Sequence, residues 1–216
     1  MLHGILSYAM SDDKEHTMKQ IDTTTADEGF AWLNPPAYAS FGRDGLAITT
    51  SNETDFWQRT HYGFRRDDGH FYYMRSRDDF HFTTQCRFDG KVQYDQCGLM
   101  VRIDAENWLK CSIEYENEEV SRLGSVVTNF GYSDWATQDI GSDMDRMHYG
   151  VHRNGSDFLI EYSFDGKRYV QMRVAHLHQG NGDVMVGVYA CSPKRAGFEC
   201  VIEEMSVGKS TWGKQQ

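Results

Sequence analysis

Apolar and polar residues alternate along most of the chain, in short segments that Gly, Asp and Asn separate. A period of two is typical of half-buried β-strands, and helical periodicity is nearly absent. The pattern predicts fourteen strands, near 38–41, 45–50, 54–59, 70–76, 79–88, 96–103, 107–115, 120–129, 134–139, 147–153, 157–164, 168–174, 184–191 and 197–207. Because this number is too large for one flat sheet, we expect an all-β sandwich of two packed antiparallel sheets.

The strand pattern also suggests where the folded domain begins and ends. Residues 1–28 carry only a short apolar piece, with neither a basic segment before it nor a small-residue cleavage site, which argues against a secretory signal peptide. We therefore expect a poorly ordered leader over 1–28, a single domain over 29–210 and a short tail over 211–216.

The hairpin "YDQCGLMVRIDAENWLKCSIEYE", residues 94–116, has two very different faces. Its first face is ordinary apolar core: Leu99, Val101, Ile103, Leu109, Cys111, Ile113 and Tyr115. Its second face mixes charge, amide and aromatic groups: Gln96, Met100, Arg102, Trp108, Lys110, Ser112 and Glu114. Indole beside hydrogen-bonding side chains suits a sugar ring or another flat polar ligand, so this face is the best candidate for a binding site.

The same alternation extends the candidate face to other strands. In "DFHFTTQCRFD", His81 and Gln85 lie opposite the phenylalanines, and neighbouring strands would bring them beside Gln96, Lys110 and Glu114. His61 lies in the aromatic-rich stretch "DFWQRTHYGFRRDDGHFYY" and could border the same site. The alternative interpretation, the solvated side of a half-buried sheet, fits these residues about as well.

Charge and composition exclude several classes of protein. The 32 acidic residues outnumber the 22 basic ones, the net charge is −10, and no basic cluster occurs. This balance argues against nucleic acid and anionic membrane surfaces as partners, and no apolar run is long enough to span a membrane. Five cysteines at spacings unlike a zinc pattern indicate reduced thiols and a cytoplasmic location.

Metal and catalytic motifs are weak. His176 and His178 alternate on one strand, with His148 and His152 nearby in sequence, yet no third and fourth zinc ligands are identifiable, so we predict no metal and no cofactor. Glu114 and Glu116 have the alternate spacing of a retaining glycosidase pair, which makes Glu114 the weak candidate for a catalytic residue.

Several multi-residue motifs carry a family resemblance. "DFWQRTHYGFRRDDGHF", the hairpin sequence above and "SVVTNFGYSDWA" resemble the DUF1349 family, over a span from about Phe30 to about Val207. That family belongs to the concanavalin A-like lectin/glucanase superfamily, and one fungal member is named for regulation of enolase. The resemblance implies a jelly-roll sandwich of two curved sheets. It implies no catalytic residues that can be carried over to this chain.

We therefore favour a protein that binds a carbohydrate or a sugar-derived metabolite, without catalysis. The expected ligand contacts are His61, His81, Gln85, Gln96, Arg102, Trp108, Lys110 and Glu114. One alternative is an enzyme acting on a sugar or sugar acid at the same face. The other, which rests only on the enolase-linked fungal relative, is a module that binds a protein partner.

Overall fold

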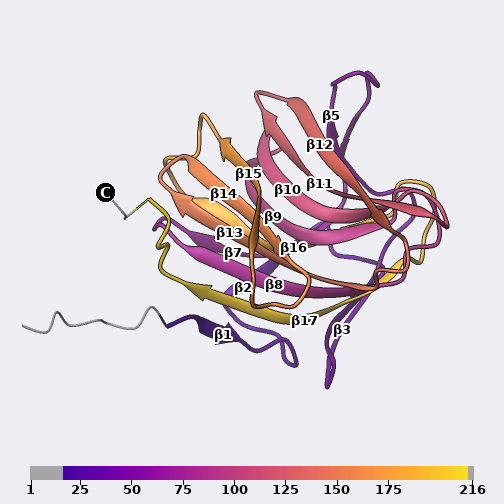
Figure 1. Cartoon of the computed structure of the whole chain (residues 1–216), viewed down its shortest axis with the longest axis horizontal. Coiled ribbons are helices and arrows are strands. Elements are labelled where there is room, and N and C mark those ends of the chain that lie inside the picture. The colour runs from indigo at the N-terminus through magenta and orange to yellow at the C-terminus, as the bar shows by residue number, and fades with distance from the viewer. Residues whose placement is uncertain (1–16, 214–216) are drawn as a thin grey trace, which may run out of the picture.

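Two antiparallel sheets pack face to face in the computed structural model, which describes residues 17–213 (Figure 1). Sheet A contains β1 (Lys19–Ile21), β3 (Tyr38–Gly42), β4 (Gly45–Thr49), β8 (His81–Phe88), β13 (Arg146–Asn154), β14 (Asp157–Ser163), β15 (Val170–His176) and β17 (Glu199–Gly208). Their spatial order is β15-β14-β13-β8-β17-β4-β3, and β1 pairs with β17.

Sheet B contains β2 (Phe30–Leu33), β7 (His70–Ser76), β9 (Gln96–Asp104), β10 (Asn107–Tyr115), β11 (Val120–Asn129), β12 (Tyr132–Gly141) and β16 (Val184–Cys191). The order is β12-β11-β10-β9-β16-β7-β2. A separate hairpin of β5 (Phe56–Gln58) and β6 (Arg65–Asp67) completes the fold. The two curved sheets confirm the predicted all-β sandwich (Figure 1).

All fourteen predicted strands are present, and three short ones were missed: β1, β2 and β6. β1 lies inside the segment predicted to be a poorly ordered leader. That prediction is wrong for residues 19–21, because they pair with β17 and Ile21 is buried. Residues 1–16 of the leader and 214–216 of the tail lie outside the described part of the chain. Within that part, no helix is long and apolar enough to cross a membrane.

The core lies between the two sheets and follows the alternation in the sequence. On β8 the residues at even positions, from Phe82 to Phe88, are buried, whereas the odd ones, from His81 to Arg87, are only half-buried. From sheet B, Leu99, Val101 and Cys111 enter the same core, as the apolar face of the hairpin predicts. Burial of one face per strand is what selects this pairing register.

Sheet B departs from simple alternation because both of its faces are covered near β9 and β10. Met100 and Trp108 point away from the main core and are nevertheless fully buried. They form a second apolar cluster with Phe56 and Trp57 of β5 and with Tyr189 of β16. The β5–β6 hairpin therefore lies on the outer face of sheet B and gives the protein a second, smaller core.

One buried hydrogen bond joins the two sheets across the main core. The Tyr149 hydroxyl on β13 accepts a hydrogen bond from the backbone N–H of Ile113 on β10, at 2.7 Å. Tyr149 is fully buried, so water cannot replace it.

We expect Tyr149→Phe to lower the free energy of unfolding by about 1–3 kcal/mol, because the N–H of Ile113 loses its partner in a dry core. Urea denaturation measures this difference. Tyr162→Phe is the matched control, since its hydroxyl accepts only from exposed Gln138. Equal stability of Tyr149→Phe and wild type would contradict the role of this bond.

Candidate functional site

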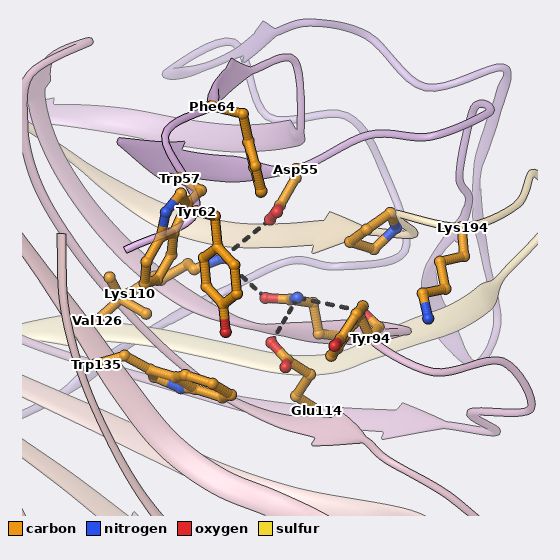
Figure 2. Close-up of a pocket in the computed structure, with 12 residues that line it drawn as sticks. Asp55, Trp57, Tyr62, Phe64, Tyr94, Lys110, Glu114, Val126, Trp135 and Lys194 are labelled. Carbon is orange, nitrogen blue, oxygen red and sulfur yellow. Dashed lines mark hydrogen bonds and ion pairs between the residues drawn. The ribbon is translucent and has the colours of Figure 1, made fainter. Parts of the chain in front are cut away.

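A cavity of about 290 Å³ opens between the β5–β6 hairpin and the outer face of sheet B (Figure 2). Its walls come from segments far apart in the sequence, and the second face of the β9–β10 hairpin supplies its floor. The lining residues are Asp55, Trp57, Tyr62, Phe64, Tyr94, Gln96, Lys110, Glu114, Val126, Trp135, Pro193 and Lys194.

Ion pairs hold the β5–β6 hairpin in place over sheet B. Arg102 of β9 is buried and donates two hydrogen bonds to the carboxylate of Asp67 on β6, at 2.7 and 2.8 Å. At the far end, Glu106 accepts from Arg59 at 3.1 Å and from Arg65 at 2.8 Å. A bidentate arginine–carboxylate pair fixes orientation as well as distance, so this wall of the cavity is rigidly positioned.

The backbone around the cavity is unusual. Arg59 and His61 in the β5–β6 turn have φ values of 54° and 61°, and Tyr94 at the edge of the cavity has a φ of 77°. Positive φ is rare for residues other than glycine and costs free energy. Such residues gather at functional sites, where the surrounding structure holds them.

Gln96 organises the floor through all four of its hydrogen-bonding positions. Its side-chain oxygen accepts from Lys110 Nζ at 2.9 Å and from the Tyr189 hydroxyl at 3.0 Å. Its Nε2 donates to Glu114 Oε2 at 2.8 Å and to the backbone oxygen of Tyr94 at 3.1 Å. An amide has two donors and two acceptor positions, so Gln96 has none left for a ligand. It acts instead as the residue that places Lys110 and Glu114.

Lys110 is almost completely buried, and its charge is balanced from several sides. Its Nζ lies 3.4 Å from Asp55 Oδ1, and 5.3 and 5.9 Å from the ring centroids of Tyr189 and Trp108. The carboxylate, the Gln96 oxygen and the aromatic faces together stabilise an ammonium ion away from water. Because an ammonium has three N–H groups and two of these partners are oxygens, one N–H is available to a ligand.

Glu114 is held in an environment that favours its neutral form. Burial raises its pKa to about 8; nearby Asp55 and Glu116 raise it as well, and Lys110 opposes the shift. Such a pKa favours the protonated form near neutral pH. Because Oε2 accepts from Gln96, a proton on the other oxygen would be able to donate to a ligand.

Aromatic side chains form the walls above this polar floor. The Trp57 ring lies edge-on to Tyr62, at 5.5 Å, and to Trp135, at 6.5 Å between centroids. Tyr62 and Trp135 are 54% and 37% exposed, so much of their ring surface is free. In Figure 2 the Tyr62 ring lies above the Trp135 ring, and both are to the left of Glu114 in this view.

Some of the residues predicted to contact a ligand line the cavity, and others lie elsewhere. Gln96, Lys110 and Glu114 line the cavity together, as the alternation predicted. Arg102 and Trp108 share their sheet face but do not line it, because Arg102 is paired with Asp67 and Trp108 is fully buried in the second apolar cluster.

His61 and Glu116 also lie outside the cavity lining. His61 is exposed in the β5–β6 turn, where its ring contacts Tyr62. Glu116 accepts from Gln93 at 2.6 Å and lies 3.9 Å from Arg122. The glycosidase-like spacing of Glu114 and Glu116 thus does not produce a pair of carboxylates in one cavity.

The prediction that His81 and Gln85 share a face with Lys110 is wrong. Both lie on β8, which belongs to sheet A, on its outer side. Gln85 donates to Glu203 at 2.8 Å, within sheet A. Alternation correctly placed these residues away from the core, but it cannot distinguish the outer face of one sheet from that of the other.

Alternation along the strands did not mark Asp55, Tyr94 and Trp135 as cavity residues. All three lie in segments that carry the family resemblance: Asp55 opens "DFWQRTHYGFRRDDGHF", Tyr94 opens the hairpin sequence and Trp135 lies in "SDWA". That resemblance was the available signal.

Known proteins resemble this chain over most of its length. The family described as "Protein of unknown function (DUF1349)" matches residues 32–210. Regulation of enolase protein 1 of Saccharomyces cerevisiae is 36% identical over 178 residues, which cover 82% of this chain and 87% of the yeast protein.

Solved structures agree with the fold. A functionally unknown protein from Saccharomyces cerevisiae superimposes with a TM-score of 0.79 at 32% identity, over 86% of this chain and 98% of that one. The Bacteroides ovatus xyloglucan PUL GH43B superimposes with a TM-score of 0.70 at 15% identity, over 92% of this chain but only 40% of that one. The second likeness shows the fold alone. The family match and the yeast relative together establish that this chain belongs to the DUF1349 family.

Proposed function

We propose that this protein binds a carbohydrate or a sugar-derived metabolite in the cavity on the outer face of sheet B. The observation that carries the proposal is the pairing of exposed aromatic faces, Tyr62 and Trp135, with the polar floor of Lys110 and protonated Glu114. A sugar ring has apolar C–H faces and hydroxyl groups at its edge, and such a site satisfies both.

The volume of the cavity and its hydrogen-bond donors indicate which ligands fit it. About 290 Å³ is at the lower end of small-molecule pockets, which favours one sugar unit or a chain end over a long polysaccharide. Lys110 and the protonated form of Glu114 are both able to donate hydrogen bonds to a ligand. They suit oxygen acceptors such as hydroxyl, ring or carbonyl oxygens.

The same geometry supports catalysis as a second candidate function. A carboxylic acid whose pKa lies near neutrality is suited to general acid chemistry, and Glu114 has this property. Asp55 lines the same cavity as a second carboxyl, in contact with Lys110. Two carboxyl groups in different environments are the usual basis of an acid–base pair.

A cytoplasmic location belongs to this proposal. All five cysteines are free and buried, which agrees with a compartment that keeps thiols reduced.

Trp135→Ala and Tyr62→Ala test the binding function. We expect each to weaken binding of a glycan-array ligand at least about tenfold, because each removes a stacking face. Isothermal titration calorimetry measures the affinities. Phe164→Ala is the control, since this phenylalanine is 57% exposed and lies outside the cavity lining. If Trp135→Ala and Tyr62→Ala both bind as tightly as wild type, the cavity is not the binding site.

Glu114→Gln tests catalysis. In a screen of chromogenic glycosides, we expect any turnover by wild type to be lost in Glu114→Gln, because glutamine donates a hydrogen bond but cannot transfer the proton. Turnover that the variant retains would exclude Glu114 as the general acid. Wild type without turnover on any glycoside would leave binding as the supported function.

The protonation of Glu114 can be measured separately, through stability. Its pKa is about 8 in the folded protein against an ordinary 4.5, so the folded state keeps a proton that the unfolded state loses between these values. The contribution of Glu114 to the free energy of unfolding is therefore greatest below pH 4.5 and is lost as the pH rises towards 8.

We expect the free energy of unfolding of wild type to fall more steeply than that of Glu114→Gln from pH 4.5 to 8. The variant has no such titration, whereas His81, whose lowered pKa acts in the opposite direction, is common to both proteins. Denaturant titrations across this range give the difference. Parallel curves would show that Glu114 ionises normally in the folded state.

A further inference from the structure

Three metal-ligating side chains meet on the outer face of sheet A, away from the cavity. They are His81 of β8, His152 of β13 and Glu161 of β14, which are neighbouring strands. His81 pairs directly with His152, and Glu161 pairs with Gly150, two residues before His152. Opposed residues of an antiparallel pair point to the same side, so the register places all three side chains together.

The distances between their donor atoms suit a single ion. One nitrogen from each histidine and one oxygen from Glu161 lie within 4.8 Å of one another, and His152 Nε2 is 3.4 Å from Glu161 Oε2. Zinc–nitrogen and zinc–oxygen bonds of about 2.0–2.1 Å place tetrahedral ligands about 3.4 Å apart. Closing the set around one metal requires the two imidazole rings, which stack nearly parallel, to rotate until their in-plane lone pairs converge.

His81 Nε2 is a buried nitrogen that has no partner. In the described part of the chain, only this atom and Ser125 Oγ are buried side-chain polar atoms without a hydrogen bond. The His81 ring stacks on that of His152, with centroids 3.7 Å apart and planes 10° from parallel. An imidazole nitrogen without a hydrogen-bond partner is able to ligate a metal ion.

The surroundings pack closely against the cluster and supply orientation. A Cβ at Gly150 would stand 3.2 Å from the Tyr169 ring and 3.5 Å from His81 Nε2, so glycine lets both side chains pack closely over β13. Ser210 Oγ lies 3.5 Å from His152 Nδ1, on the side of the ring away from Glu161. A partner on the second imidazole nitrogen is the usual way in which a metal-binding histidine is oriented.

We propose that His81, His152 and Glu161 bind a divalent transition-metal ion of the zinc type, with a fourth position open to water or a ligand. Two imidazoles and one carboxylate suit zinc, cobalt, nickel or ferrous iron. They do not suit calcium or magnesium, which prefer oxygen ligands throughout. The proposal is independent of the cavity on sheet B and does not rest on the proposed function.

Metal titration of the full chain tests this site. The protein, freed of any histidine tag and dialysed against EDTA, is titrated with Zn²⁺ by calorimetry and with Co²⁺ by visible absorption. We expect one ion per chain, a Co²⁺ spectrum of low coordination number, and a rise in melting temperature with Zn²⁺.

Glu161→Gln is the main variant because it keeps the shape of the side chain, and His81→Gln is the second. Both should bind Zn²⁺ at least about 10- to 100-fold more weakly, which is the loss that even an outer partner of a metal site produces. Their melting temperatures should no longer rise with Zn²⁺, and an unchanged melting temperature without metal shows that the fold is intact.

His176→Gln is the matched control, because His176 and His178 on and after β15 are exposed imidazoles with ring centroids 4.9 Å apart. We expect this variant to bind as wild type does. Equal affinity of wild type and Glu161→Gln would show adventitious binding to surface histidines. Wild type that binds neither ion would show that the cluster is a packing contact alone. Either result overturns the proposal.

Discussion

A single saturated amide holds the cavity together. Gln96 lies on a buried strand position of sheet B, beside an ammonium and a carboxyl that could not remain there unpaired. Ionisable groups away from water need partners with specific geometry, and the amide provides two acceptor and two donor positions at once. Without it, Lys110 would lose its nearest oxygen and Glu114 its only hydrogen-bond donor among the described side chains. The chemical character of the floor therefore depends on Gln96, although Gln96 itself has no capacity left for a ligand.

The β5–β6 hairpin explains why such groups can be buried on an outer sheet face. It covers Met100 and Trp108 with apolar side chains, and the pair between Arg102 and Asp67 fixes its position. Arg102 is buried and the Asp67 side chain is one-third exposed, so loss of Asp67 would leave a buried guanidinium without its charged partner. The Arg102–Asp67 pair thus positions the β5–β6 hairpin as well as stabilising the fold. It determines where Trp57 and Tyr62 stand over the floor.

Both sheets use their outer faces in the same way. On each, a short polar cluster is partly buried against residues from a distant segment, with aromatic or imidazole rings beside carboxyl groups. Glu114 and His81 have pKa values shifted mainly by burial, in opposite chemical directions, and both are neutral at pH 7. An ionisable side chain loses less solvation free energy on burial when it is neutral than when it is charged. The two clusters lie on different sheets and form separate chemical environments within one small domain.

Strand positions and the division of each strand into core and outer faces follow from the sequence alone. Alternation is a local property, and Leu99, Leu109, Phe82 and Cys86 are buried where it placed them. The joint position of Gln96, Lys110 and Glu114 was equally predictable, because one hairpin holds all three. Tertiary structure decided the rest. Strand order assigned His81 to sheet A, and the hairpin from residues 56–67 converted Trp108 and Arg102 from surface to buried groups. These outcomes depend on contacts between segments far apart in sequence, and periodicity carries no information about which segments will meet.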